Sequence, residues 1–549
     1  MKKLIFSSNS IPLITIVLFS FFALLAMFHN GIPLTHDGQD HLARIANFYA
    51  SLSEGIIIPR WAGNLNWGYG HPVMMFLYPL PSYMASFFHF LGFDISNSFK
   101  LVFAFSFIAS SLAMYYWLRT FSGIYPALLG AILYIYLPYR FVDMYVRGAV
   151  GEHVSFIFPP LICYFFVKSN LKGNFWSFIG IVLSSAGLIL AHNAISIMFF
   201  PIIIFYGLLS SLRHKDVILA GKQIASIGYG ALLSAFFWVP AFLEGKYTLR
   251  DIVTGSEEYS HRFTNLKSLL YGDWNYGITG QFSTQIGLVG LTVLVMGLFF
   301  LFKRHSAQRK SLIFWYGVFV VSIFLMLPIS KPIYEIFTIL QKFQFPWRFL
   351  SVTVFSVSVI SAITFSYFSK KNQKIIVSIF LVTLLIVSLP YMKAKGYLEK
   401  DDVFYSATYN GTTDTGESAP IWSVRFMEKR PKRVAEFIDG YGQISPKIRK
   451  TTIHTYEIQS KTNSKILENT LYFPGWNVYV DGKKVPIEFQ DQNHRGLITF
   501  PLTSGNHKID IIFQDTKVRL VSNLISSVYF LLLILFSVLK LVKRSTRKS

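Results

Sequence analysis

The chain has 549 residues, of which 52% are hydrophobic and only 14% charged, with 54 Phe and 30 Tyr. The core of a soluble domain cannot hide so much apolar surface, so the composition predicts a membrane protein. Basic residues outnumber acidic ones by 51 to 28, for a net charge of +23, and many lie in short clusters between apolar runs. This is the positive-inside pattern, so the charge does not indicate nucleic acid as a partner.

Apolar runs recur along most of the chain. The first, Ile11 to Phe28, is long enough to cross a bilayer, and no small-residue cleavage site follows it, so we expect an uncleaved first span. Further spans are expected to begin near Leu101, Gly123, Val154, Phe175, Ala194, Ile224, Ile286, Leu312, Phe349, Ile375 and Leu520. The sequence therefore predicts a polytopic α-helical membrane protein with about twelve transmembrane helices.

The loop after the first span is rich in ionisable residues. "THDGQDHLARI" supplies Asp37, Asp40, His41 and Arg44, and "IIIPRWAGNLNWGYGHPV" adds Arg60, Trp61 and His71. Carboxylates suit deprotonation of an acceptor or metal binding, and Arg and His suit phosphate. The alternative is an amphipathic interfacial helix, residues 40–50, with a belt of Trp residues.

The segment 76–93 decides the topology. It is apolar enough to be a thirteenth span, but it has two prolines near its start, and His89. If it lies on the membrane surface, both termini and the basic clusters fall on the cytoplasmic side, and the loops 31–100, 139–153, 243–285, 330–348 and 393–519 face outward. If it spans, the first and second loops lie on opposite faces.

The second outer loop reads "PYRFVDMYVRGAVGEH". Asp143 and Arg147 are four residues apart, so on a helix they would share a face and could pair, with Glu152 further on. They are either site residues or a structural salt bridge. His192, in "AHN", ends a later span, and Arg348, beside Trp347, begins another. Arg348 could hold a lipid phosphate or act as an interfacial anchor.

The segment 393–519 has the composition of a soluble domain. From residue 469 it alternates apolar and polar residues and breaks at Pro-Gly, Asp-Gly and Ser-Gly, which predicts a small β-sandwich outside the membrane. The earlier "YNGTTDTGESAP" is expected to be irregular. The predicted domains are 1–392, a transmembrane catalytic module, 393–519, the β-sandwich-like domain, and 520–549, the last span and a basic cytoplasmic tail.

The chain contains no Gly-rich phosphate loop, Cys/His metal pattern or nucleophile elbow. A donor from the cytoplasmic nucleotide pool is therefore not expected. An outward-facing site would need a donor delivered through the membrane.

The motifs "HDGQDHLARI", "PRWAGNLNWGYGHPVMMFLYPLPSY", "DMYVRGAVGE", "QFPWRF" and "YFPGWNVYVDGK" together resemble bacterial membrane proteins of the glycosyltransferase C superfamily. The resemblance is strongest to its "6-pyruvoyl-tetrahydropterin synthase-related", YfhO-like branch. It implies that Asp37 is the catalytic base, that Asp143 is a second acid, with Glu152 as a further candidate, and that Tyr78 starts a second surface helix. Asp40 competes with Asp37 as the base, because it lies three residues further on and would share roughly the same helix face. Superfamily members typically take a sugar from a polyprenyl-phosphate donor.

The first hypothesis is therefore a glycosyltransferase of the bacterial cytoplasmic membrane. It would move a sugar from a polyprenyl-phosphate carrier to an extracytoplasmic acceptor, a cell-envelope glycan, lipid or protein, and invert the anomeric configuration. Arg60, Arg147 and Arg348 would neutralise the leaving phosphate, and Asp143 with Glu152 could hold a divalent Mg or Mn ion. The alternatives are a transporter or lipid flippase, although the spans contain few charges, and a non-catalytic scaffold that displays the β-domain.

Overall fold

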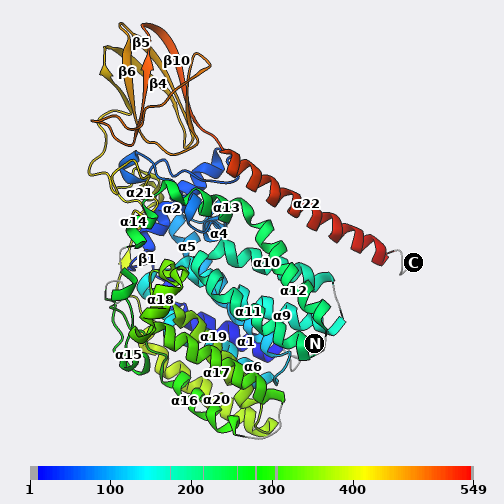
Figure 1. The fold of residues 1–549 in the computed structure, drawn as a ribbon. Helices are drawn as coiled ribbons and strands as arrows, with labels where there is room; N and C mark the ends of the chain where they lie inside the picture. The colour runs from blue at the N-terminus through cyan, green and yellow to red at the C-terminus, as the bar shows by residue number, and fades with distance from the viewer. Residues whose placement is uncertain are drawn as a thin grey trace, which may run out of the picture. The chain divides into compact units, whose positions relative to one another are not determined.

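A computed structural model of the chain describes residues 10–172, 175–213, 216–255, 258–277, 281–302 and 307–545 (Figure 1). The initial "MKK" and parts of the basic clusters, including 303–306 and 546–548, lie outside these residues. Contacts group the chain into two compact units. The first unit comprises 1–38, 97–231 and 257–399, and the second comprises 39–96, 232–256 and 400–549.

Long apolar helices dominate the chain. Among the described residues, seven helices are long and apolar enough to cross a membrane, or up to nine if two bent pairs each count as one span. Three shorter apolar helices, Ser10–Ala23, Phe175–Ala191 and Leu288–Leu301, occupy further predicted spans. The polytopic helical fold is confirmed, and the count of twelve crossings stays a prediction.

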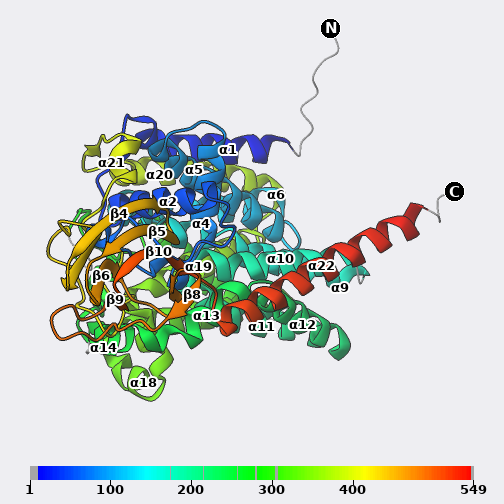
Figure 2. The ribbon, with the colours of Figure 1, turned by 90° about the horizontal axis from the view of Figure 1, so that it is seen from above.

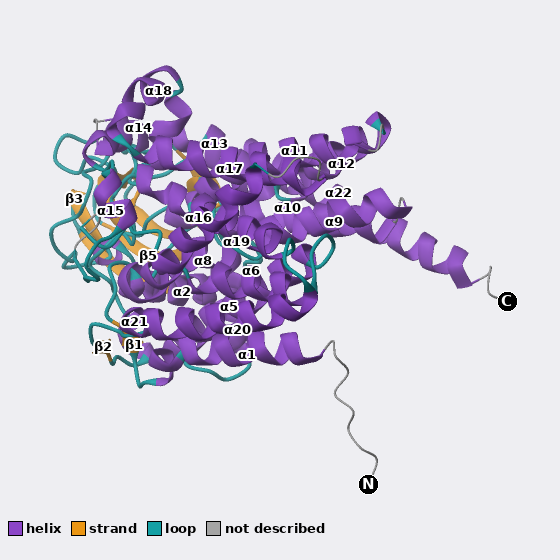
Figure 3. Ribbon diagram, turned by 90° about the horizontal axis from the view of Figure 1, so that it is seen from below, coloured by secondary structure: helices purple, strands orange, loops and turns teal. Residues whose placement is uncertain are grey.

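The helices of ten or more residues are α1 (Ser10–Ala23), α2 (Gly38–Ser53), α4 (Leu80–Phe90), α5 (Ile95–Leu118), α6 (Ile124–Tyr136), α9 (Phe158–Lys172), α10 (Phe175–Ala191), α11 (Asn193–Arg213), α12 (Val217–Leu233), α16 (Leu288–Leu301), α17 (Ala307–Met326), α19 (Leu350–Phe365), α20 (Lys370–Ser388) and α22 (Lys517–Ser545). Helices are purple in Figure 3.

Helix α19 is the core of the first unit. Every residue of α19 is buried, and the helix packs against α6, α16 and α17. Small residues allow this close packing: a Cβ at Gly130 of α6 would lie 2.7 Å from the Ser358 carbonyl oxygen of α19. The helix pair is therefore held by backbone-to-backbone proximity, as is common between helices in membranes.

The segment after α6 breaks into short pieces. Pro138 follows Leu137, whose backbone is extended, and starts α7 (Pro138–Phe141) at a new angle, 45° from α6. A π-helix, Val142–Arg147, continues it and ends at Gly148, which has a left-handed conformation, before α8 (Val150–Ser155). Irregular helices of this kind are frequent at functional sites.

The second unit begins with the amphipathic helix predicted over 40–50, observed as α2. The ambiguous segment 76–93 contains the short α3 (Val73–Phe76) and the eleven-residue α4. At 1.5 Å per residue, α4 is about 16 Å long, too short for a hydrocarbon core of about 30 Å. The segment therefore does not form one spanning helix. Also in this unit, α13 (Ala235–Leu243) packs against α22.

A β-sandwich forms the largest part of the second unit. One sheet has the order β4-β5-β10-β7-β8 and the other β3-β6-β9, and all neighbours are antiparallel (Figures 1 and 2). Apolar residues of both sheets, such as Tyr456, Ile466 and Ile509, share one core. The strands are β3 (Ala435–Asp439), β4 (Gly442–Arg449), β5 (Ile453–Ser460), β6 (Ser464–Leu471), β7 (Trp476–Val480), β8 (Lys483–Val485), β9 (Leu497–Leu502) and β10 (Gly505–Phe513).

The predicted mainly-β domain is confirmed, but it begins earlier than the alternation indicated. Strands β3 to β5 and most of β6 precede residue 469, and β4 exposes nearly all its residues, so its sequence carries no clear alternation. The predicted Asp-Gly turn is present, with positive φ at Asp481 and Gly482 between β7 and β8. The "YNGTTDTGESAP" segment contains no helix or strand, as expected.

Candidate active site

Asp37 lies in the loop between the short strand β1 (Ile32–Pro33) and α2, and it is exposed. Two backbone hydrogen bonds fix this loop to the end of the π-helix: His36 N donates to Val146 O at 3.0 Å, and Asp37 N to Arg147 O at 2.9 Å. Gly148 permits the contact, because a Cβ there would collide with Thr35 Oγ1. The hydrogen bonds therefore hold the Asp37 loop beside the loop 139–153.

Behind this loop lies a buried set of ionisable side chains, which we name the carboxylate–arginine cluster: Tyr139, Asp143, Arg147, Glu152 and Arg348. Arg147 Nη1 lies 2.5 Å from Asp143 Oδ1 and 2.9 Å from Glu152 Oε2. Arg348 Nε lies 3.4 Å from the same Glu152 oxygen, and the Tyr139 hydroxyl donates to Glu152 Oε1. Both carboxylate side chains are fully buried. The predicted pairing of Asp143 with Arg147 is thus confirmed.

Aromatic side chains and backbone carbonyls hold the two arginines. The guanidinium of Arg147 lies 4.7 Å from the ring centre of Trp347, and Arg348 Nη1 donates to Phe343 O at 2.8 Å. Removal of one partner from such a buried pair typically costs about 3–5 kcal/mol, because the other charge is left without compensation. The two arginines of the cluster are therefore fixed in position, and the buried carboxylates depend on their positive charge.

Sequence reasoning missed two fully buried neighbours, Arg140 and His153. The Arg140 guanidinium lies 3.9 Å from the ring centre of Phe156 and 3.3 Å from Ser110 Oγ. Within the described residues, Arg140 Nε and Nη1 and Asp143 Oδ2 have no hydrogen-bond partner. The spacing of three residues between Arg140 and Asp143 was the available signal, since it places both on one helix face.

Two histidines adjoin these groups in the first unit. His192 interacts electrostatically with Glu152 and Arg348. His36 is half-buried, and its Nε2 lies 2.5 Å from Gly277 O, so this nitrogen carries the proton and donates it. Burial lowers the pKa of His36 and outweighs the hydrogen bond to Gly277 and the charge of Asp37, which both act to raise it. His36 is therefore neutral at neutral pH.

The predicted Mg or Mn site at Asp143 and Glu152 does not fit this geometry. Both carboxylates contact the same guanidinium, Arg147, which takes the place that a cation would fill. Among the described residues, no group of three or more His, Cys, Asp or Glu side chains is arranged to hold a metal ion. A metal ion at this position would have to displace Arg147, and we assign it no step.

Three predicted site residues lie on α2, and they contact the loop 409–420, which belongs to the same second unit. Asp40 accepts a hydrogen bond from the Tyr409 hydroxyl at 2.6 Å. Arg44 donates through Nη2 to Thr413 O, and its Nη1 lies 3.1 Å from His41 Nδ1. Thr413 has a positive φ of 63°, a strained conformation for a β-branched residue. These side chains therefore hold the 409–420 loop in place.

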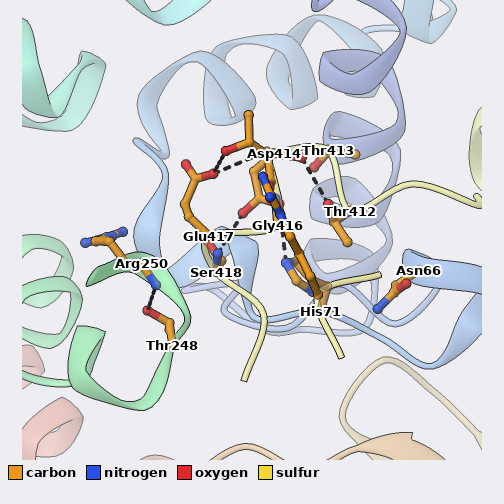
Figure 4. A network of polar contacts seen from close by, with 12 residues as sticks. Asn66, His71, Thr248, Arg250, Thr412, Thr413, Asp414, Gly416, Glu417 and Ser418 are labelled. Atoms are coloured by element: carbon orange, nitrogen blue, oxygen red, sulfur yellow. Dashed lines mark hydrogen bonds and ion pairs between the residues drawn. The ribbon is translucent and has the colours of Figure 1, made fainter. Parts of the chain in front are cut away.

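His71 belongs to the same network (Figure 4). Its Nε2 lies 3.5 Å from Asp414 Oδ1, and both side chains are almost fully buried. Asp414 also accepts hydrogen bonds from the backbone N–H groups of Gly416 and Ser418, at 3.0 and 3.1 Å. Burial acts to raise the pKa of Asp414, but His71 and the hydrogen bonds outweigh it and hold the pKa below its usual range. For neighbouring Glu417, burial and the Asp414 charge raise the pKa.

The remaining predicted binding residues also lie in the second unit. Arg60 Nε lies 3.3 Å from Asp515 Oδ1, and its Nη2 donates to Asn523 Oδ1 at 2.8 Å, so it anchors the start of α22. Trp61 is buried, with its ring edge-on to Trp476. Tyr78 is half-buried between α3 and α4. Of the predicted site residues, the first unit thus brings together Asp143, Arg147, Glu152, His192 and Arg348, with Asp37 fixed to Arg147.

Comparisons with known proteins identify relatives. The chain is 24% identical, over 318 residues, to an uncharacterized protein of Lactococcus lactis subsp. cremoris (strain MG1363); the match covers 54% of this chain and about half, 51%, of the relative. Distant likenesses exist to solved structures, and the three described next are 13%, 10% and 12% identical to this chain.

Three of these solved structures illustrate the likeness. Arabinofuranosyltransferase AftD from Mycobacteria has a TM-score of 0.46, and the match covers 71% of this chain and 27% of AftD. The apo oligosaccharyltransferase of Archaeoglobus fulgidus has a TM-score of 0.41, with 73% and 56% covered. ArnT from Cupriavidus metallidurans, bound to undecaprenyl phosphate, has a TM-score of 0.36, with 68% and 64% covered.

Residues 75–394, more than half of the chain, match one family of membrane proteins. The match spans α4, the carboxylate–arginine cluster and the helices around α19. The chain belongs to the family described as the 6-pyruvoyl-tetrahydropterin synthase related domain membrane proteins.

Proposed function

We propose that this protein is an integral-membrane glycosyltransferase that transfers a sugar from a polyprenyl-phosphate donor to a hydroxyl group of an extracytoplasmic acceptor. The observation that carries this proposal is the exposed Asp37 carboxylate, fixed by its own backbone to Arg147 of the buried carboxylate–arginine cluster. A base and a set of cations are thus adjacent at the end of apolar helices.

In the proposed reaction, an Asp37 carboxylate oxygen accepts the proton of the acceptor hydroxyl. At the same time, the oxygen of that hydroxyl attacks the anomeric carbon of the sugar. A new glycosidic C–O bond forms as the bond from the anomeric carbon to the phosphate oxygen breaks. The electron pair of that bond leaves with the polyprenyl phosphate, and the single displacement inverts the anomeric centre. General bases of this type typically contribute about 10²–10⁴-fold to rate.

The leaving phosphate needs compensation for its developing charge, and Arg348 and Arg147 are the proposed donors. Arg348 contacts Glu152 at 3.4 Å, whereas Arg147 contacts its carboxylates at 2.5 and 2.9 Å. The longer contact makes Arg348 the easier of the two to draw onto a phosphate. Arg147 would supply the fixed part of the positive field and orient Glu152.

Purified protein in lipid vesicles, supplied with a labelled polyprenyl-phosphate sugar and a mixture of envelope glycan acceptors, tests the function. We expect labelled product to form with inverted configuration and polyprenyl phosphate to be released in equal amount. A transporter or flippase would instead move the intact labelled lipid between leaflets without breaking its glycosidic bond. That result, or no turnover by correctly folded protein with any acceptor, would contradict the proposal.

A further inference from the structure

The second unit contains a cavity of about 220 Å³ that the reaction proposed above does not use. Its walls come from the second half of α2, the loop 61–69 that follows it, and the turn between β4 and β5. The residues that define its chemistry are Ala50, Glu54, Trp61, Tyr69, Arg449 and Lys450. At about 30 Å³ per water molecule, it has room for about seven waters, a volume suited to a single small ring.

Hydrogen bonds between the walls fix the shape of the cavity. Both carboxylate oxygens of Glu54 accept from Thr451 N, at 2.9 and 3.1 Å, which ties α2 to the β4–β5 turn. Asn64 N donates to Asn47 Oδ1 at 2.9 Å, and Leu471 N donates to Tyr69 O at 2.9 Å. The cavity is therefore formed before any ligand arrives, which lowers the entropy cost of binding.

The aromatic wall is equally well fixed. Trp61 packs edge-on against Trp476, at 5.3 Å between ring centres, and contacts Phe513 at 5.4 Å. Gly70, with φ of +79°, allows the indole to take this position, because a Cβ there would lie 2.5 Å from Trp61 Nε1. Trp61 is 1% exposed and Tyr69 8%, so Trp61 supports the wall from behind and Tyr69 presents a small, rigid apolar patch to the cavity.

The charges around the cavity favour a neutral ligand with both donors and acceptors. Glu54 offers a carboxylate, and Lys450 offers an ammonium group that makes no ion pair within the described residues. The charge of Arg449 is already matched by Glu468, 2.7 Å away. A phosphate would gain from Lys450 but would be repelled by Glu54, whereas a polyol can donate to the carboxylate and accept from the ammonium.

We propose that this cavity binds one sugar residue of a glycan. The small apolar patch of Tyr69 would contact C–H groups of the ring, and Glu54, Lys450 and the outer edge of Arg449 would take the hydroxyl groups. The further assignment of this sugar to the acceptor rests on the proposed function. The binding itself does not, because it requires no bond to break.

Equilibrium binding tests the site. The probes are methyl glycosides of common hexoses, pentoses and N-acetylhexosamines, measured one at a time by saturation-transfer NMR on the full-length protein in detergent. Ala50→Trp fills the cavity without removing a hydrogen bond, and Ala50→Ser is its matched control. At least one glycoside should bind the wild type and Ala50→Ser equally, and bind Ala50→Trp about tenfold or more weakly.

Lys450→Ala gives a second test that does not depend on the folding of Ala50→Trp, since Lys450 is an exposed side chain. It should weaken the same glycoside severalfold. Absence of binding by every glycoside, or equal binding to Ala50→Trp and wild type, would overturn the proposal. So would inorganic phosphate binding that is lost in Lys450→Ala while no glycoside binds. Glycoside binding in a protein without transferase activity would contradict only the proposed function.

Discussion

Two regions of this chain bury carboxylates, and they satisfy them in different ways. In the first unit, Asp143 and Glu152 are met by two arginines, and Asp143 Oδ2 has no partner among the described residues. In the second unit, Asp414 has His71 on one side and backbone N–H groups on both oxygens. Both oxygens of Asp414 thus accept hydrogen bonds within one loop, whereas Asp143 keeps one oxygen without a partner among the described residues, close to the loop that carries the exposed Asp37.

This difference divides one short stretch of sequence into two roles. Asp37 and Asp40 are three residues apart, but Asp37 is exposed and its backbone is hydrogen-bonded to Arg147, whereas the Asp40 carboxylate accepts a hydrogen bond from Tyr409. An acidic residue that already accepts a hydrogen bond from a phenol is less available as a base. Of the two carboxylates, Asp37 is therefore the better candidate for the catalytic base.

The largest effect is expected when the arginine of the first cluster is removed. Arg147→Met would leave Asp143 and Glu152 buried without their shared cation, at a cost of about 3–5 kcal/mol. We expect a large fall in the melting temperature of the purified protein and in its yield from membranes. Lys371→Met removes one exposed positive charge and is the control. Equal melting temperatures for the two variants would show that the cluster contributes little to the fold.

The Asp414 network should show its contribution through pH. Because the pKa of Asp414 is depressed, its ionised form stabilises the fold above the unfolded value, near about 3.9, and this stabilisation is lost as the pH falls through the folded value. Asp414→Asn should therefore cost about 1–3 kcal/mol at pH 6, and the difference from wild type should shrink below about pH 4. Exposed Asp251→Asn, followed by the same unfolding measurements, should show little difference at either pH. A cost for Asp414→Asn that does not change with pH would contradict the ionised state assigned to Asp414.

A smaller effect is expected from Gly148→Ala, which pushes Thr35 and the Asp37 loop away from the π-helix. Gly55→Ala imposes a similar positive φ with nothing within 4 Å of the new Cβ, so it separates backbone strain from displacement. Transfer should fall roughly tenfold or more in Gly148→Ala relative to Gly55→Ala, because small misplacements of a catalytic group are costly. Equal transfer rates would mean that the position of the loop does not matter.

The smallest effect concerns divalent metal. Arg147 lies between the two carboxylates that sequence reasoning offered as ligands. Treatment with EDTA, followed by assay with and without added Mg or Mn, should change the transfer rate by less than about twofold, since no step uses a metal. A loss of activity that Mn restores would show that the cluster rearranges to bind a cation.

The sequence predicted these features unevenly, for physical reasons. Long apolar runs and the four-residue spacing of Asp143 and Arg147 are local signals, and both predictions were confirmed. The partners of His71 and Arg44, in contrast, lie more than 300 residues away in a loop without regular structure. Local patterns contain no information about such contacts. Polar residues that sequence reasoning grouped as one binding site are therefore divided between two units.

In the β-domain, the alternation of apolar and polar residues revealed only some of the strands. Strands β7 and β10 alternate because one face packs in the sandwich core, so period-two patterning revealed them. Strand β4 is exposed along most of its length, and Glu468 of β6 is a buried carboxylate held by Arg449 and His454. These strands do not follow the apolar-in, polar-out rule, and they were missed.

Single-turnover transfer from a bound polyprenyl-phosphate sugar, compared between Asp37→Asn, Asp40→Asn and wild type, tests the central claim most directly. Asp37→Asn keeps the size of the side chain and removes the base, so its rate should fall about 100-fold or more without a change in melting temperature. Asp40→Asn should lose much less, since its amide oxygen can still accept from Tyr409. A near wild-type rate in Asp37→Asn beside an inactive Asp40→Asn would make Asp40 the base, and full activity in both variants would contradict the mechanism.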